Sequence, residues 1–217
     1  MKAIELVKTE IINAAQQLHK KNMLAACDGN ISYRVNDNEI WITPAGVPKS
    51  QLRIEDFAKI NLDGDILSGN PSSERLMHLS VYRNCPEAKA VVHAHPPTAI
   101  AWTIACPGLT ELPNRSMSEL IIAAGSIPIA PYAMPGTEAM GKAIEPLLSA
   151  HRMIILARHG ALSWGESVTE ALNGMERLEH SADILMRAKQ LGGLTELPEK
   201  DIEALWNIRK TIGNKTI

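Results

Sequence analysis

The stretch that most constrains this chain is residues 90–95, which read AVVHAH. Small and β-branched apolar residues run directly into two histidines spaced two positions apart, a pattern typical of a buried strand. Because side chains alternate across a strand, His93 and His95 are expected to converge on one point. Two imidazoles directed at one point suit a divalent transition metal such as zinc. The alternative is a pair of ordinary half-buried histidines, so a metal site needs a third ligand.

His159 is the candidate for that third ligand. It follows an apolar run at residues 153–157 and precedes Gly160, which lets the backbone turn at the end of an expected strand. With His93 and His95 it would leave a tetrahedral metal one open position, as in catalytic rather than structural zinc sites. The remaining histidines lack such spacing and are interpreted as structural or solvated: His19, His78, His151 and His180.

Composition narrows the class of protein. A length of 217 residues with 45% hydrophobic and 21% charged residues fits one globular domain, which we expect to span residues 1–217. A net charge of −2 gives no basic field for nucleic acid. The chain has no apolar run of the roughly 18 residues that a membrane span needs, and its charged N-terminus is not a signal peptide. Three cysteines without CxxC spacing favour a reducing, cytoplasmic location.

Hydrophobic periodicity and turn signals predict a mixture of hairpins and helices. Strands are expected at residues 31–35, 39–43, 57–62, 65–67, 90–95, 127–130, 153–157 and 161–164. Helices are expected at residues 4–22, 74–84, 97–105, 118–124, 137–148, 168–191 and 197–212, with Ser73 and Thr137 as N-caps. Strict βαβ alternation is missing, so we expect an α/β fold whose mixed, largely antiparallel sheet is covered by helices.

Three loops carry groups suited to an anion. Ser72 and Ser73 precede an expected helix, where free N–H groups and the helix dipole attract negative charge, although simple helix capping is the alternative. The turns at Gly29 and Gly46 can form nests of backbone N–H groups, but glycine turns are also common without a ligand. Lys49, just beyond, is either a surface lysine or a phosphate contact.

Five short motifs follow one another along the chain: Gly29-Asn30-x-Ser32, Thr43-Pro44-x-Gly46, Pro71-Ser72-Ser73-Glu74, His93-Ala94-His95 and His159-Gly160. In this order they resemble the class II aldolase/adducin superfamily over residues 4–190, and most closely its L-fuculose-1-phosphate aldolase branch. The resemblance implies a three-layer α/β/α sandwich. It also implies a homotetramer with active sites at subunit interfaces.

The resemblance assigns roles to individual residues. His93, His95 and His159 match three ligands of Zn²⁺, although another divalent transition metal would suit the same nitrogens. Glu74 matches a carboxylate that touches the metal and acts as acid/base, whereas its alternative role is only to complement a helix dipole. A cradle for a substrate phosphate is expected at five positions: Gly29, Asn30, Gly46, Ser72 and Ser73.

Two departures from the family pattern bear on the substrate. Cys27 and Ala45 stand where the related aldolases often carry threonine, so two hydroxyls are missing from the expected phosphate site. Near the position where those aldolases use a tyrosine from a neighbouring subunit, this chain has Glu119. A carboxylate there is similar to the glutamate acid/base of methylthioribulose-1-phosphate dehydratases, and the alternative is an exposed helix residue.

The resemblance and the chemistry together predict a zinc-dependent aldolase that cleaves a small ketose 1-phosphate into dihydroxyacetone phosphate and a short aldehyde. Such cleavage leaves an enediolate, whose charge a divalent metal stabilises, and Glu74 would move the protons. A dehydratase using Glu119, a 4-epimerase and a decarboxylase are rivals on the same scaffold, although the epimerase branch usually has aspartate in place of Glu74. A non-catalytic module like the adducin head is a further alternative, but such domains tend to lose metal ligands.

Overall fold

The computed structural model describes residues 2–215, so Met1 and the last two residues of the expected domain lie outside it. The strands are β1 (Asn30–Asn36), β2 (Glu39–Ile42), β3 (Ala58–Ile60), β4 (Ile66–Ser68), β5 (Ala90–Ala94), β6 (Ile129–Ala130), β7 (Met153–Leu156) and β8 (Gly160–Gly165). The helices are α1 (Lys2–Lys20), α2 (Arg75–Asn84), α3 (Pro97–Ala105), α4 (Ser118–Ala123), α5 (Glu138–Leu148), α6 (Val168–Gln190) and α7 (Glu199–Ile212). Two short 3-10 turns, Lys49–Gln51 and Ile54–Asp56, follow β2. Each expected strand and helix is present, with its ends shifted by at most two residues.

The strands form one sheet in the order β4-β3-β2-β1-β5-β8-β7-β6. Neighbouring strands are antiparallel except for β6 and β7, which are parallel and are joined through α5 as a parallel pair requires. The expected mixed, largely antiparallel sheet is therefore confirmed. The histidine-bearing strand β5 lies between β1 and β8 and is buried along its whole length.

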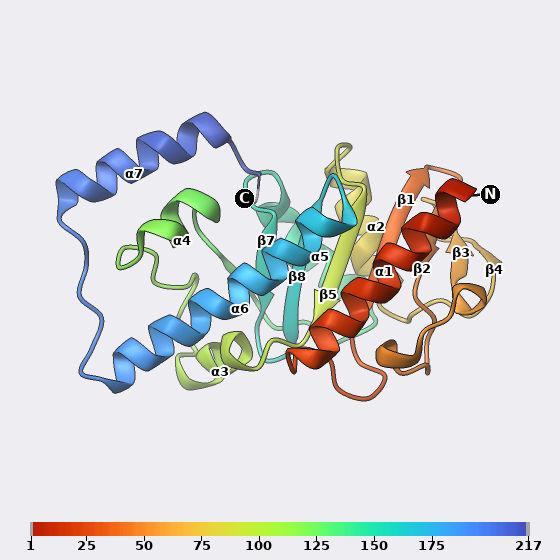
Figure 1. Cartoon of the computed structure of the whole chain (residues 1–217), viewed down its shortest axis with the longest axis horizontal. Coiled ribbons are helices and arrows are strands. Elements are labelled where there is room, and N and C mark those ends of the chain that lie inside the picture. Colours follow the sequence, from red (N-terminus) through yellow and green to blue (C-terminus); the bar gives the residue numbers. More distant parts are fainter. Residues whose placement is uncertain (1, 216–217) are drawn as a thin grey trace.

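Helices cover both faces of this sheet and make three layers (Figure 1). Helices α1, α3 and α6 pack on one face, and α2 and α5 pack on the other. In β5, Val92 faces the α1/α6 layer and Val91 faces the α2/α5 layer, which is the alternation expected of a strand. His93 therefore shares the face of Val91, on the side of the sheet where α2 lies.

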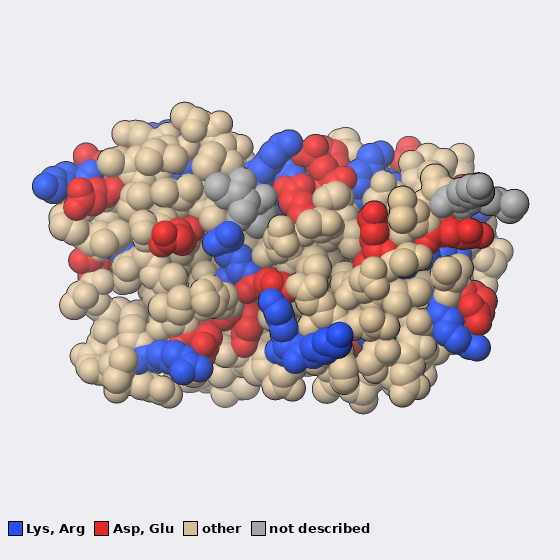
Figure 2. Space-filling model, viewed as in Figure 1, with Lys and Arg blue, Asp and Glu red and all other residues tan. Residues whose placement is uncertain are grey.

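The C-terminal part of the chain lies beside the sheet rather than on it. Helix α7 packs against α4 at one end of the molecule (Figure 1). Lysine, arginine and acidic side chains alternate over the face seen in Figure 2, with no large patch of one sign. Between residues 2 and 215, none of the helices combines the length and apolar character needed to span a bilayer.

Of the two expected helix caps, Ser73 is wrong, whereas Thr137 stands at the N-cap of its helix but forms no side-chain cap. Glu74, not Ser73, stands at the N-cap of α2, where no side-chain cap is formed; Ser72 Oγ accepts a hydrogen bond from the Glu74 N–H at 3.3 Å. Thr137 does precede α5, but its hydroxyl donates to Met134 O at 2.7 Å instead of capping the helix. Short hydroxyl side chains have several backbone partners within reach, and sequence alone does not choose between them.

Glycine is required at position 29 both by the backbone conformation and by the lack of room for a Cβ atom. Its φ is +70°, and a Cβ atom there would lie 2.3 Å from Leu24 Cδ2 and 2.8 Å from His93 O. We expect Gly29→Ala to lower the free energy of unfolding by about 2–4 kcal/mol, since a left-handed residue and overpacking each cost energy. Gly108→Ala is the matched control, because a methyl group there meets nothing within 4 Å. Chemical denaturation with equal midpoints for both variants would contradict this expectation.

Candidate active site

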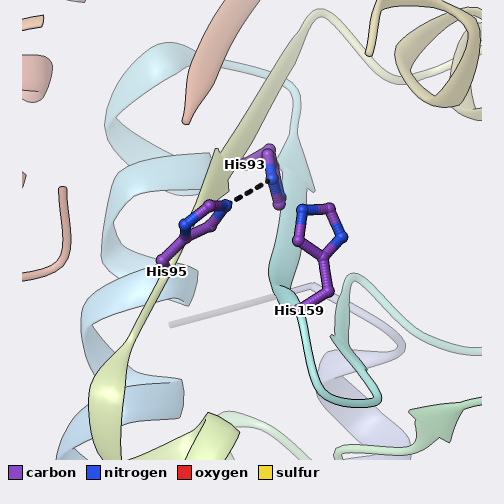
Figure 3. A group of neighbouring side chains, drawn as sticks. All are labelled: His93, His95 and His159. Atoms are coloured by element: carbon purple, nitrogen blue, oxygen red, sulfur yellow. Dashed lines mark hydrogen bonds between the residues drawn. The ribbon is translucent and has the colours of Figure 1, made fainter. Parts of the chain in front are cut away.

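Three histidines meet at one end of the sheet (Figure 3). His93 belongs to β5, His95 follows that strand, and His159 lies in the turn between β7 and β8. One nitrogen from each lies within 4.8 Å of the others, and the ring centroids are 4.9–5.1 Å apart. Pairing of Ala94 with Ala161 brings the end of β5 beside that turn. The structure thus brings together the three histidines that the sequence singled out.

The turn that carries His159 is tightly built. Arg158 has a φ of +57°, so the backbone reverses just before the histidine. A Cβ atom at Gly160 would lie 2.5 Å from Ala94 O and 2.9 Å from the His93 ring. Glycine is therefore needed at position 160 for β8 to approach β5 closely enough to bring His159 to the other two rings.

Hydrogen bonds orient two of the rings. His93 Nδ1 lies 2.9 Å from Ala161 O and must donate to it, which turns Nε2 of His93 toward the site. His95 Nδ1 lies 3.4 Å from Asp28 Oδ2, and its Nε2 is 3.2 Å from Nε2 of His93. Burial, together with the neighbouring His93 and His159, lowers the pKa of His95 to about 4. Rings held at Nδ1 with Nε2 turned inward are oriented as histidine ligands of a metal are.

The carboxylate of Glu74 lies against the same rings. Its Oε2 is 3.1 Å from His93 Nε2 and accepts a hydrogen bond from Asn30 Nδ2 at 2.8 Å. Its Oε1 is 3.1 Å from His159 Nε2. Burial on its own raises the pKa of Glu74, but the charge of His93 and hydrogen bonds from His159, His93 and Asn30 hold that pKa far below its usual range. Glu74 is therefore an ionised, acceptor-only group.

This donor set fits a divalent transition metal. The 3.2 Å between the Nε2 atoms of His93 and His95 is close to the edge of a tetrahedron, which is about 3.3 Å for metal–nitrogen bonds of about 2.0 Å. Among residues 2–215, Glu74 has histidines as its only ion-pair partners, so its buried charge calls for a cation. Three imidazoles and one carboxylate suit Zn²⁺ and also other divalent transition metals.

A cavity of about 400 Å³ opens beside these groups. All five residues expected to form the phosphate cradle line it, together with Glu74, His95 and His159: Gly29, Asn30, Gly46, Ser72 and Ser73. A larger hollow of about 790 Å³ between α1, α3 and α6 contains none of the predicted site residues. The smaller cavity is therefore the one that joins a cation site to a set of potential anion donors.

Two further charged residues line this cavity: Asp28, which the sequence did not assign to the site, and Lys49, for which the sequence left a surface position and a phosphate contact open. Asp28 contacts His95 and keeps about half of its side chain exposed, at 50%. Lys49 is 2% exposed, so it is not a surface lysine. The position of Asp28 beside the Gly29 turn is the one sequence signal that points to it, whereas nothing local marks Lys49 as buried.

Lys49 holds the turns of the cavity together. Its Nζ donates to Cys27 O and Val47 O at 2.9 Å each, and to Pro44 O at 3.3 Å. Burial lowers the pKa of Lys49, and negative groups nearby partly offset that effect. Within the described residues no carboxylate pairs with it directly. A positive charge is thus held beside the Gly46 turn without a neutralising partner.

Glu119 lies elsewhere. It is exposed on α4, where its carboxylate accepts a hydrogen bond from the Ser118 hydroxyl at 2.9 Å. It does not line the cavity, and α4 lies to one side of the sheet, apart from the strand ends that carry the histidines (Figure 1). The structure therefore does not bring Glu119 to the histidines of its own chain.

Known proteins share this architecture. A family model described as Class II Aldolase and Adducin N-terminal domain matches residues 9–186. The chain is 31% identical over 190 residues to a 3-oxo-tetronate 4-phosphate decarboxylase of Escherichia coli K12, covering 85% of this chain and 88% of the relative. It is 33% identical over 202 residues to a 5-deoxy-D-ribulose 1-phosphate aldolase of Bacillus thuringiensis, covering 91% and 92%. A solved L-fuculose 1-phosphate aldolase matches with a TM-score of 0.82 and 28% identity, over 94% of this chain and 96% of the other.

Proposed function

The chain belongs to the class II aldolase and adducin family, and from that premise we propose that it is a metal-dependent aldolase. It would cleave a small ketose 1-phosphate into dihydroxyacetone phosphate and a short aldehyde. The observation that carries the proposal is the ionised Glu74 in contact with two of three clustered histidines, at the wall of a cavity that also holds the Ser72–Ser73 loop. We further propose that residues 1–217 act as one domain in the cytoplasm.

The phosphate would bind on the side of the cavity away from the histidines. The Ser72–Ser73 hydroxyls and the backbone N–H groups of the Gly29 and Gly46 turns are the donors available there. Lys49 adds a positive charge beside these turns. A phosphate fixed at this place orients the neighbouring carbonyl of the sugar toward the histidines.

Cleavage then needs two proton transfers. A base must take the proton of the hydroxyl on the carbon whose bond breaks, and the electrons move onto the former carbonyl to leave an enediolate. A divalent metal held by His93, His95 and His159 supplies the electrophile that stabilises this negative charge. Glu74 would accept the hydroxyl proton and then return a proton to the enediolate carbon, which completes dihydroxyacetone phosphate.

A decarboxylase acting on a 3-oxo acid phosphate is the second candidate, favoured by the Escherichia coli relative. Loss of carbon dioxide also leaves an enolate, but it requires no base to remove a hydroxyl proton. The carboxylate of Asp28, 3.4 Å from His95, would repel a substrate carboxylate bound beside that histidine. Glu74 and Asp28 together therefore favour the aldolase.

A homotetramer with interfacial sites stays part of the proposal. Glu119 is exposed at the surface of α4, so a role in catalysis requires it to reach the cavity of a neighbouring subunit. A dehydratase, which would rely on Glu119 as its main acid/base, depends on that arrangement entirely. The aldolase proposal does not, because Glu74 is supplied by the same chain as the histidines.

One substrate panel separates these activities. The purified protein is incubated with L-fuculose 1-phosphate, 5-deoxy-D-ribulose 1-phosphate and 3-oxo-tetronate 4-phosphate, and products are followed by ¹³C and ³¹P NMR with and without a chelator. We expect dihydroxyacetone phosphate and an aldehyde from a ketose 1-phosphate, and none after chelation. Release of carbon dioxide from the oxo acid alone would instead identify a decarboxylase.

Removing the buried cation tests the phosphate cradle. We expect Lys49→Met to weaken the binding of inorganic phosphate by about 10- to 100-fold, because the site loses a nearby positive charge and the ammonium group that holds its turns. Isothermal titration calorimetry measures this directly. Lys142→Met is the control, since Lys142 is 74% exposed and pairs with Glu138 on α5. Equal phosphate affinity in both variants would remove Lys49 from the site.

A further inference from the structure

We infer that His78 is a positioning residue that fixes the Glu74 carboxylate through the side chain of Asn30. The inference rests on the proposed role of Glu74 as the acid/base. His78 lies on α2, within four residues of Glu74 in the sequence, but it does not touch that carboxylate directly. It acts through a neighbouring strand instead.

A continuous series of side-chain hydrogen bonds links α2 to β1 and ends at the site. Asn30 Nδ2 donates to Glu74 Oε2 at 2.8 Å, and Asn30 Oδ1 lies 2.5 Å from His78 Nε2. His78 Nδ1 lies 2.7 Å from Ser32 Oγ, which lies 2.7 Å from Tyr82 Oη. The four side chains behind Glu74 are buried, with exposures between 0% and 2%. Water cannot substitute for any of these partners.

The direction of every bond follows from the orientation of the Asn30 amide. Its Nδ2 donates to Glu74 Oε2 at 2.8 Å, so the NH₂ group faces the carboxylate. The amide oxygen of Asn30 then faces His78, and Nε2 of that ring must carry a proton. Burial lowers the pKa of His78 to about 3, so the ring is neutral at physiological pH and its Nδ1 is bare.

The two remaining hydrogen bonds, between His78 and Ser32 and between Ser32 and Tyr82, run in the same direction. A bare Nδ1 on His78 accepts from the Ser32 hydroxyl, which has only one hydrogen, so Tyr82 must donate to Ser32. Burial raises the pKa of Tyr82, so its hydroxyl stays protonated. The other acceptor near that hydroxyl, Lys89 O, is farther away at 3.4 Å. Each donor thus points toward Glu74.

Donation in the opposite direction along this series is excluded by the site itself. A proton on Nδ1 of His78 would leave Nε2 as an acceptor, and the Asn30 amide would have to flip. Its carbonyl oxygen would then face a Glu74 oxygen at 2.8 Å, with two acceptors and no hydrogen between them. The tautomer of His78 therefore decides whether the acid/base is held in place or pushed out of it.

The tautomer is directly measurable. Protein labelled with ¹⁵N-histidine and saturated with zinc is examined by long-range ¹H–¹⁵N NMR near neutral pH, and His78 is assigned from the signals that vanish in His78→Gln. We expect a neutral ring with its proton on Nε2. A ring protonated on Nδ1, or on both nitrogens, would overturn the inference whether or not any variant folds.

Two substitutions separate positioning from structural support. Glutamine can place an N–H where Nε2 of His78 lies, whereas asparagine is too short to reach Asn30. We expect His78→Asn to lower kcat by about 10- to 100-fold, as for other groups that orient a site residue, with KM and zinc content nearly unchanged. His78→Gln is expected to retain most of the turnover.

Equal losses of kcat in His78→Asn and His78→Gln would contradict positioning and indicate a packing role alone. A fall in zinc content or a rise in KM that accounts for the lost activity would do the same. Failure of this inference is distinguishable from failure of the proposed function. Full activity in Glu74→Gln would remove the acid/base role, whereas the tautomer of His78 is read without any turnover.

Discussion

Glu74→Gln is expected to lower turnover by about 10²- to 10⁴-fold, the range typical for loss of a general acid/base. Glutamine keeps the shape of the side chain and an oxygen that can accept the Asn30 hydrogen bond, but it cannot take a proton from the substrate. The fold and the three-histidine cluster are expected to remain. The change should therefore appear in kcat, with little effect on zinc content or phosphate affinity.

The measurement is a coupled assay for dihydroxyacetone phosphate, with zinc content and circular dichroism recorded on the same samples. Glu138→Gln is the matched control, because Glu138 lies in the first turn of α5 and its side chain is 78% exposed. The control is expected to match the wild type. Wild-type turnover in Glu74→Gln would show that another group moves the protons.

His93→Ala is expected to abolish both metal binding and turnover. The side chain is 0% exposed, and its Nε2 lies 3.2 Å from His95 Nε2 and 3.1 Å from Glu74 Oε2. Without it, the remaining ligands do not form a three-imidazole site, and several kcal/mol of charge stabilisation are lost. We therefore expect a fall in kcat of about 10³-fold or more.

His180→Ala serves as the control for His93→Ala, because His180 is exposed on α6 and lies outside the cavity. Zinc content and turnover are measured for both variants under the same conditions. A His93→Ala protein that keeps its metal and its activity would remove the histidine cluster from the mechanism. Circular dichroism distinguishes loss of the metal from loss of the fold.

The part of the histidine site that could be predicted is the part whose geometry is local. The alternation of AVVHAH is enough to place His93 and His95 on one side of a strand, and the glycine after His159 indicates a turn. The antiparallel pairing of β5 with β8, which actually brings His159 to the other two, is a long-range register. Sequence pattern predicts that both segments are strands but not that they are neighbours.

Lys49 illustrates what sequence could not supply. Lysine is rarely buried, so a lysine after a turn is normally expected at the surface. Its burial depends on three backbone carbonyls from two separate turns converging on one ammonium group. Cys27 lies 22 residues before Lys49 in the sequence, and no local pattern predicts that the two meet.

The sequence places His78 among the structural or solvated histidines, and the structure shows it fully buried in the core. A signal for its partners was present in two spacings. His78 and Tyr82 are four residues apart and share a helix face, while Asn30 and Ser32 are two apart and share a strand face. What the sequence does not contain is the packing of α2 against β1, which joins the two pairs into one network.

The central claim is that the clustered histidines hold a metal on which sugar-phosphate cleavage depends. The most direct test is the rate of ketose 1-phosphate cleavage by the wild-type protein, measured against its metal content as a chelator removes the ion and zinc restores it. We predict that cleavage falls in proportion to bound metal, vanishes in the metal-free protein and returns at about one ion per chain. Undiminished cleavage by a protein shown to contain no metal would contradict the account.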